Sequence, residues 1–247
     1  MEDFRYINNK EKFLEYAFEV LKAYFYDRDA FDVFYKNIPG KHDRNLFLKI
    51  ISFYKYLVKD GSFINCISDT DDPNQLKETK ISYIDETYKF IAIFSLIEGL
   101  IEVDNYEEFH SWLRKTHDFK KNPIDSKNKF DNLRSTYLKE FGSTNRAIKF
   151  FNNLDDDTKK ELKSKIVLPG KMHPHLIDDQ VIKIIAGFLY KIRSEFVHKS
   201  RIILETSKGK IVSTINGELV ISDLNLEDLK SIFERGFLSN FGYKFTK

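Results

Sequence analysis

The stretch Leu189–Ile203 reads LYKIRSEFVHKSRII and lies at the end of a strongly apolar segment with helical spacing. It places Arg193 and His198 with four residues between them and continues with two more basic residues, Lys199 and Arg201. Arginine is always charged and grips phosphate oxygens with a planar fork, and histidine takes up and releases a proton near neutral pH. These residue types indicate phosphate chemistry, and no other part of the sequence suggests a reaction.

The spacing of the two residues sets a geometric condition. On an unbroken α-helix, residues five apart point about 140° apart and are displaced by about 7.5 Å along the axis. Arg193 and His198 of one subunit cannot then share a phosphate. Either the helix ends or distorts near Val197, or two subunits pool their residues across a two-fold axis. The plain structural alternative is an Arg/His pair that interacts with the negative end of the helix dipole.

The same two residue types suit RNA as a substrate. RNA carries its own nucleophile, the 2′-hydroxyl, so a histidine that acts as acid or base and an arginine that stabilises charge on phosphorus would cleave it without a metal ion. The expected products are a 2′,3′-cyclic phosphate and a 5′-hydroxyl.

Outward from this stretch, apolar residues recur every three or four positions, which predicts a succession of helices. The predicted helices span 10–26, 28–37, 43–59, 84–103, 107–119, 128–141, 143–153, 158–166 and 225–238, and a further helix begins at 178–179 and carries the stretch quoted above. After Ile203 the period changes to two, which predicts short strands over 202–205, 211–215 and 218–221, with Asn216-Gly217 as a hairpin turn. The sequence therefore predicts a mainly α protein with a small C-terminal β-hairpin and a terminal helix.

Turn-forming residues without an apolar anchor suggest a domain boundary at Ser68–Asn74. We divide the chain into an N-terminal helical region (1–67), a connector (68–80) and a main helical domain that includes the hairpin and last helix (81–247).

Composition bounds the class of protein. With 42% hydrophobic and 15% aromatic residues, the chain is not a disordered protein. Forty Lys and Arg against 38 Asp and Glu leave a net charge of +2, so any affinity for nucleic acid must come from a local patch. The single cysteine, Cys66, excludes an internal disulfide and suits a reducing compartment. The first residues are charged, and the longest apolar run, Phe90–Val103, is too short to span a bilayer. We expect a cytoplasmic protein that does not bind membranes.

The acidic residues at 69–72 only partly match the pattern of a metal site. Asp69, Asp71 and Asp72 would begin a calcium loop, but an EF-hand needs Gly and Glu at the positions that hold Asn74 and Lys80. We therefore interpret this segment as a solvated turn.

The histidines also fall short of a metal site. His110 and His117 are two helical turns apart, which is too far for one ion. His173 and His175 flank Pro174 in a predicted loop. The sequence leaves two roles open for them, as metal ligands or as phosphate contacts. We expect no metal and no cofactor.

Glu98 lies in the predicted helix 84–103 between the apolar neighbours Ile97 and Leu100. It is either an exposed residue on the polar face of that helix or a carboxylate aimed at the Arg193 site. The sequence leaves both interpretations open.

Residues Leu189–His198 resemble the signature of the HEPN superfamily, in which an Arg is followed by a polar residue and then, after three more, by His on the last core helix. Ser194 fills the polar position. Upstream, Tyr88–Leu100 (YKFIAIFSLIEGL) resembles the long first HEPN helix, with Glu98 where such domains often carry an acid. The resemblance covers residues 80–200 and is greatest to Apea-like HEPN proteins, leaving the N-terminal region and the hairpin unexplained.

This resemblance implies an antiparallel helical bundle that forms a homodimer with a composite active site. Many such proteins are metal-independent endoribonucleases of toxin, CRISPR or anti-phage systems. It implies Arg193 as the phosphate stabiliser and His198 as the acid or base. The supporting residues are Ser194, Glu98, Lys199 and Arg201. RNA and a regulatory or antitoxin protein are the implied partners. The alternative function is that of a non-catalytic module that binds nucleotides, RNA or a protein.

Overall fold

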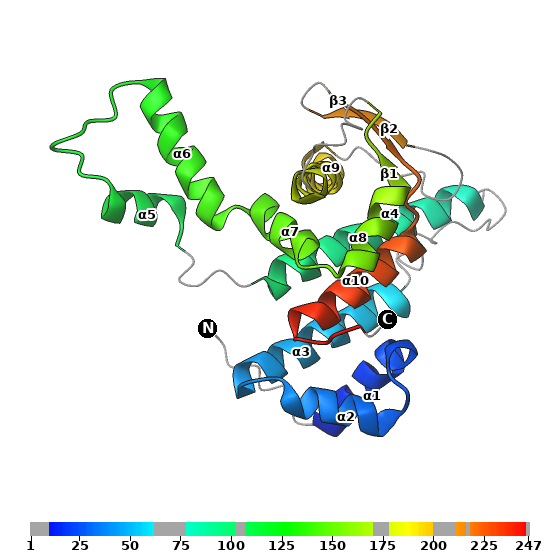
Figure 1. The fold of residues 1–247 in the computed structure, drawn as a ribbon. Helices are drawn as coiled ribbons and strands as arrows, with labels where there is room; N and C mark the ends of the chain where they lie inside the picture. Colours follow the sequence, from blue (N-terminus) through cyan, green and yellow to red (C-terminus); the bar gives the residue numbers. More distant parts are fainter. Residues whose placement is uncertain are drawn as a thin grey trace, which may run out of the picture.

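The computed structural model describes residues 10–61, 78–101, 107–169, 178–199, 211–215 and 218–245. The elements are α1 (Lys10–Leu21), η1 (Lys22–Tyr24), α2 (Arg28–Asn37), α3 (Lys41–Tyr54), η2 (Lys55–Lys59), α4 (Glu78–Leu100), α5 (Phe109–Thr116), α6 (Lys127–Phe141), α7 (Ser143–Asn152), α8 (Asp156–Lys165), β1 (Ile166–Val167), α9 (Asp178–Lys199), β2 (Ile211–Ile215), β3 (Glu218–Ser222) and α10 (Leu226–Asn240). The mainly helical fold, with a hairpin followed by a last helix, is confirmed (Figure 1).

The observed elements follow the predicted ones closely where the signal is local. α2 has the predicted bounds, and the predicted division between α6 and α7 falls at Gly142. The helix predicted over 10–26 stops as an α-helix at Leu21 and continues as one 3-10 turn, η1. The strand predicted over 202–205 and the turn at 216–217 lie outside the described residues. Of the helices that the structure describes, none is both long enough and apolar enough for a membrane span.

A three-stranded antiparallel sheet, in the order β1-β3-β2, lies at one edge of the helices (Figure 1). β2 and β3 form the predicted hairpin, with Ile215 opposite Glu218. β1 was not predicted: α8 ends at Lys165, and Ile166, which we expected to end that helix, instead pairs with Ser222. Two residues are too few to show the periodicity of a strand. Ile166 and Val167 form a strand only because they pair with β3, which lies far along the chain.

Side chains cap the starts of two of these helices. Asn225 and Asp228 form a reciprocal capping box at the start of α10. Asp155 caps α8 by accepting the Thr158 N–H at 3.1 Å, and its carboxylate also accepts a hydrogen bond from Arg235 at 2.8 Å. Burial alone would raise the pKa of Asp155, but the hydrogen bonds from Thr158 and Arg235 hold that pKa below its ordinary value. The cap therefore also ties α8 to α10.

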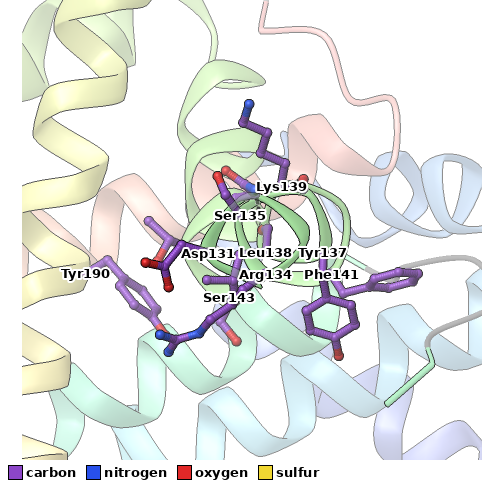
Figure 2. Close-up of a pocket in the computed structure, with 12 residues that line it drawn as sticks. Asp131, Arg134, Ser135, Tyr137, Leu138, Lys139, Phe141, Ser143 and Tyr190 are labelled. Atoms are coloured by element: carbon purple, nitrogen blue, oxygen red, sulfur yellow. Dashed lines mark hydrogen bonds between the residues drawn. The ribbon is translucent and has the colours of Figure 1, made fainter. Parts of the chain in front are cut away.

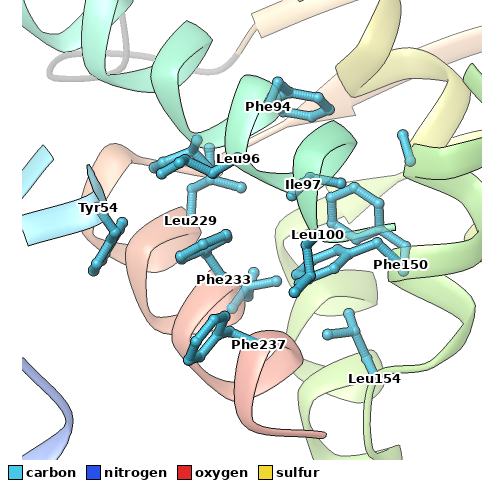
Figure 3. Packing of buried hydrophobic residues seen from close by; sticks show 14 of the residues in the cluster. Tyr54, Phe94, Leu96, Ile97, Leu100, Phe150, Leu154, Leu229, Phe233 and Phe237 are labelled. Atoms are coloured by element: carbon cyan, nitrogen blue, oxygen red, sulfur yellow. The ribbon is translucent and has the colours of Figure 1, made fainter. Parts of the chain in front are cut away.

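One hydrophobic core joins the N-terminal helices to the rest of the protein. On α3, the Phe47 ring lies 4.8 Å from the Phe237 ring and Tyr54 lies 4.7 Å from Phe233, both on α10. Figure 3 shows Tyr54, Phe233 and Phe237 packed beside the buried side chains of α4 and α7. The predicted N-terminal region thus shares its core with α4, α7 and α10. Most of the predicted connector lies outside the described residues.

A buried carboxylate joins the N-terminal helices to α10. Glu234 accepts hydrogen bonds from the Tyr54 hydroxyl at 2.8 Å and the Tyr24 hydroxyl at 3.0 Å, and it pairs with Lys59 at 2.7 Å. Burial, together with the nearby Glu234 charge, raises the pKa of both tyrosines well above its ordinary value. Both hydroxyls therefore remain protonated donors.

At Gly236, α10 packs tightly against Phe150 of α7 and against Leu154, which follows that helix. A Cβ atom at this position would lie 2.4 Å from Cζ of Phe150 and 2.7 Å from Cδ2 of Leu154. Because Phe150 is fully buried, it has no free space to move into. We expect Gly236→Ala to lower the free energy of unfolding by about 1–3 kcal/mol, measured by urea denaturation.

The matched control is Gly187→Ala on α9, where an added Cβ meets no atom within 4 Å. This substitution should raise the unfolding free energy by about 0.5–1 kcal/mol, because alanine favours a helix interior over glycine. Equal stability of the two variants would show that α10 does not pack against Phe150 as described.

Candidate functional site

α9 presents one apolar face to α4 and α7 and carries Arg193 and His198 near its C-terminal end. The buried residues of this face are Ile182, Ile185, Ala186, Leu189 and Ile192. Arg193 directly follows Ile192, so its side chain emerges at the border of the buried face, where it is 18% exposed. The helical spacing of the apolar residues therefore positions Arg193 against α4 rather than in solvent.

Arg193 is held from two sides. A terminal nitrogen of its guanidinium lies 3.3 Å from Oε1 of Glu98 on α4, and the guanidinium lies 5.6 Å from the centre of the Tyr190 ring. The Nε–H of Arg193 is buried and has no hydrogen-bond partner among the described residues. Buried donors in folded proteins almost always have an acceptor. The described part of the protomer therefore makes no hydrogen bond to this donor.

Glu98 sits where three helices meet. Its side chain is only 17% exposed, so it is not the exposed polar-face residue that one interpretation of the sequence required. Its carboxylate contacts Arg193 of α9, while its backbone carbonyl accepts a hydrogen bond from Arg146 of α7 at 3.3 Å. Two cationic side chains therefore converge on one acidic residue, and together they fix the position of Glu98 relative to α9.

His198 lies on the same helix but not beside Arg193. α9 continues as an α-helix through Val197 and His198 to Lys199, so the helix does not end or distort between Arg193 and His198, as one alternative required. The reason lies in packing: the Phe196 ring contacts Tyr88 of α4 at 5.7 Å, which holds the last turn of α9 in place. On this unbroken helix His198 points about 140° away from Arg193, and it is exposed. Within one protomer the structure brings Arg193 to Glu98, not to His198.

The remaining predicted supporting residues are placed only in part. Ser194 is partly buried, directly after Arg193. Lys199 ends α9, but its side chain, like the whole of Arg201, lies outside the described residues.

A pocket of about 630 Å³ lies beside this site, between α6, the start of α7 and Tyr190 of α9 (Figure 2). Its cationic lining residues are Arg134 and Lys139 of α6, and Asp131 is its one acidic residue. Figure 2 shows Arg134 and Tyr190 at the same end of the pocket. Because the Tyr190 ring also contacts the Arg193 guanidinium, the pocket and the candidate site share a wall.

The described residues contain no group of three or more His, Cys, Asp or Glu side chains that would hold a metal ion. His110 is exposed, and His117 makes a 2.6 Å hydrogen bond with the backbone carbonyl of Asn122. His173, His175 and the acidic turn at 69–72 lie outside the described residues.

Sequence reasoning missed three residues around the site. Tyr190 lies one turn before Arg193, so the rule that residues three apart share a helix face would have found it. Arg146 and Arg134 gave no such signal, because their closeness to α4 and α9 depends on how distant helices pack.

Comparisons with known protein families, curated proteins and solved structures give no match to this chain. The resemblance to the HEPN superfamily therefore rests on the motif and its helical setting alone.

Proposed function

We propose that this chain is a metal-independent endoribonuclease of the HEPN type that acts as a homodimer. The observation that carries the proposal is the setting of Arg193: Glu98 and Tyr190 hold its guanidinium in place, and its Nε–H has no hydrogen-bond partner among the residues that the structure describes. A phosphate oxygen is the acceptor that best suits such a donor. His198, exposed near the end of the same helix, supplies the proton-transfer group.

In this proposal, the 2′-oxygen of RNA attacks the adjacent phosphorus as His198 removes the proton from the 2′-hydroxyl. The bond from phosphorus to the 5′-oxygen breaks, and that oxygen takes up a proton from the same His198, which became protonated when it accepted the proton of the 2′-hydroxyl. Arg193 stabilises the negative charge that develops on the phosphoryl oxygens. The products are a 2′,3′-cyclic phosphate and a 5′-hydroxyl, and Glu98 serves as a positioning residue for Arg193.

A homodimer reconciles this chemistry with the unbroken α9. Because Arg193 and His198 diverge within one protomer, the proposed site takes Arg193 from one subunit and His198 from the other. Two such sites then form about the two-fold axis. A role in anti-phage defence or in a toxin system, with a regulatory or antitoxin partner, follows from the family resemblance only.

The test is to incubate the purified protein with a labelled single-stranded RNA in the presence of EDTA and to identify the product ends. We expect cleavage with 2′,3′-cyclic phosphate ends, and we expect His198→Ala to reduce the rate about 10²- to 10⁴-fold. His42→Ala, which removes another exposed histidine on α3, is the matched control and should cleave like the wild type.

Three results would contradict the proposal: no cleavage by the wild type, cleavage that EDTA abolishes, or equal cleavage by the His198→Ala variant. RNA binding that survives His198→Ala, without any cleavage by the wild type, would instead identify the alternative, a non-catalytic RNA-binding module.

A further inference from the structure

The helices α5 and α6 and the loop between them form an arm, residues 109–141, that projects from the body of the protein (Figure 1). It has a small hydrophobic core of its own. The buried residues of that core are Trp112, Leu113, Tyr137 and Phe141. The Tyr137 hydroxyl also donates a 2.8 Å hydrogen bond to the backbone carbonyl of Glu107 at the base of α5. The α5–α6 arm is therefore a packed helical hairpin rather than a loose loop.

The α5–α6 arm is strongly basic, although the whole chain is nearly neutral. Residues 109–141 hold eight Lys and Arg against four Asp and Glu, a net charge of +4, whereas the whole chain carries +2 and the remainder therefore −2. All eight basic side chains are exposed. They are Arg114, Lys115, Lys120, Lys121, Lys127, Lys129, Arg134 and Lys139. This is the local basic patch that a nearly neutral chain needs in order to bind nucleic acid.

Five of these cations have no acidic partner in the described part of the chain. Lys115, Lys121 and Lys129 pair with nearby carboxylates. The unpaired ones are Arg114, Lys120, Lys127, Arg134 and Lys139. No carboxylate among the described residues neutralises their charges, so they attract an anionic ligand, and more strongly at low salt.

Two aromatic side chains stand among these cations where α5 ends and α6 begins. Phe119 is 46% exposed and Phe130 is 40% exposed. Cations interleaved with exposed aromatic rings are typical of surfaces that bind single-stranded nucleic acid, because phosphates pair with the cations while bases stack on the rings. An acidic protein partner would explain the cations but not the rings.

The basic surface reaches the candidate site. Arg134 and Lys139 belong to the α5–α6 arm and also line the pocket whose opposite wall is Tyr190 (Figure 2). Tyr190 in turn contacts Arg193. Cations and aromatic rings thus continue from the arm, through the pocket, to the proposed phosphate-binding residue.

We propose that the α5–α6 arm holds single-stranded RNA and leads it through this pocket to Arg193. The choice of RNA over other anionic polymers rests on the proposed function. In this arrangement the arm contributes affinity and positions the strand, whereas His198 contributes only to cleavage. Binding and cleavage are therefore separable.

The test compares two variants that lose the same charge. The arm variant replaces four unpaired cations by glutamine: Lys120→Gln, Lys127→Gln, Arg134→Gln and Lys139→Gln. The body variant replaces four exposed lysines outside the arm: Lys22→Gln, Lys36→Gln, Lys41→Gln and Lys160→Gln. Since all eight positions are exposed, both variants should show the circular dichroism melting curve of the wild type.

Binding of a fluorescein-labelled 20-nucleotide single-stranded RNA is measured by anisotropy at several salt concentrations, with all proteins carrying His198→Ala to prevent cleavage. We expect the arm variant to lose about tenfold or more in affinity. We also expect the slope of log K against log salt concentration to become less steep by up to about 3, since each lost phosphate contact reduces that slope by about 0.7. The body variant should bind like its parent.

Equal binding by the arm variant and the body variant would overturn the arm proposal, whatever the cleavage test shows. Stronger binding of the parent to vesicles of anionic lipid than to RNA would overturn the choice of ligand. A loss of binding confined to the arm variant, in a protein whose wild type does not cleave RNA, would support the arm and contradict only the proposed endoribonuclease activity.

Discussion

A dimer that carries Arg193→Ala in one subunit and His198→Ala in the other should retain about half of the wild-type RNA cleavage, whereas each homodimeric variant should lose about 10²-fold or more. In the mixed dimer one of the two pooled sites loses both residues, and the other keeps both. The geometric basis is the unbroken α9, on which Arg193 pairs with Glu98 and His198 faces away. Mixed dimers are obtained by co-expressing two differently tagged chains and purifying on both tags.

A second mixed dimer is the control for this experiment, and it should give the opposite result. A mixed dimer of a wild-type chain with a chain that carries both substitutions has no complete pooled site, so it should be as inactive as the homodimeric variants. If Arg193 and His198 acted within one protomer, this control would keep half of the activity and the first mixed dimer would have none. A protein that sediments as a monomer while it cleaves RNA would also refute the pooled site.

Replacing Glu234 by alanine should lower the free energy of unfolding by about 3–5 kcal/mol, because the substitution leaves buried polar groups without a partner. The Tyr54 hydroxyl is fully buried and donates to Glu234, and Tyr24 and Lys59 share the same carboxylate. These partners lie on the N-terminal elements, so the substitution also weakens their attachment to α10. Urea denaturation, followed by the circular dichroism of the helices, measures the loss.

Glu227→Ala is the matched control on the same helix. The Glu227 side chain is 78% exposed, and among the described residues it pairs with Lys230, one turn away, whose side chain is 12% exposed. Because the Glu227 carboxylate itself is solvated and accepts from no buried hydroxyl in the described part of the chain, its removal should change stability by about 1 kcal/mol or less, well below the loss expected for Glu234. If both variants unfolded at the same urea concentration, Glu234 would not join the N-terminal helices to α10.

Much of the fold followed from local patterns in the sequence. The bounds of α2, the division between α6 and α7 at Gly142 and the capping box at Asn225 all depend on residues within a few positions of one another. The β2–β3 hairpin was predicted for the same reason. In contrast, β1 exists only because β3 lies beside it, and the sequence around Ile166 contains no sign of that pairing.

The sequence predicted which residues belong to the candidate site but not how they are arranged in space. Arg193 and His198 were found from their chemical types, and Glu98 from its place in an apolar helix. Whether Glu98 faced solvent or Arg193 depended on how α4 packs against α9, and these residues are far apart in the chain. The contact of Arg146 with Glu98 and the pocket at Arg134 were not predicted from the sequence for the same reason.

By itself, the amino-acid sequence determined the helices, their caps, the hairpin and the residue types suited to phosphate chemistry, because these depend on side chains within one or two helical turns. Tertiary structure alone decided that α9 runs unbroken past Val197, since the contact of Phe196 with Tyr88 holds its last turn against α4. It also decided that Glu98 meets Arg193 and that the basic arm ends at a pocket beside Tyr190. Those contacts join helices that are distant in the chain, and only the packing of their apolar faces brings them together.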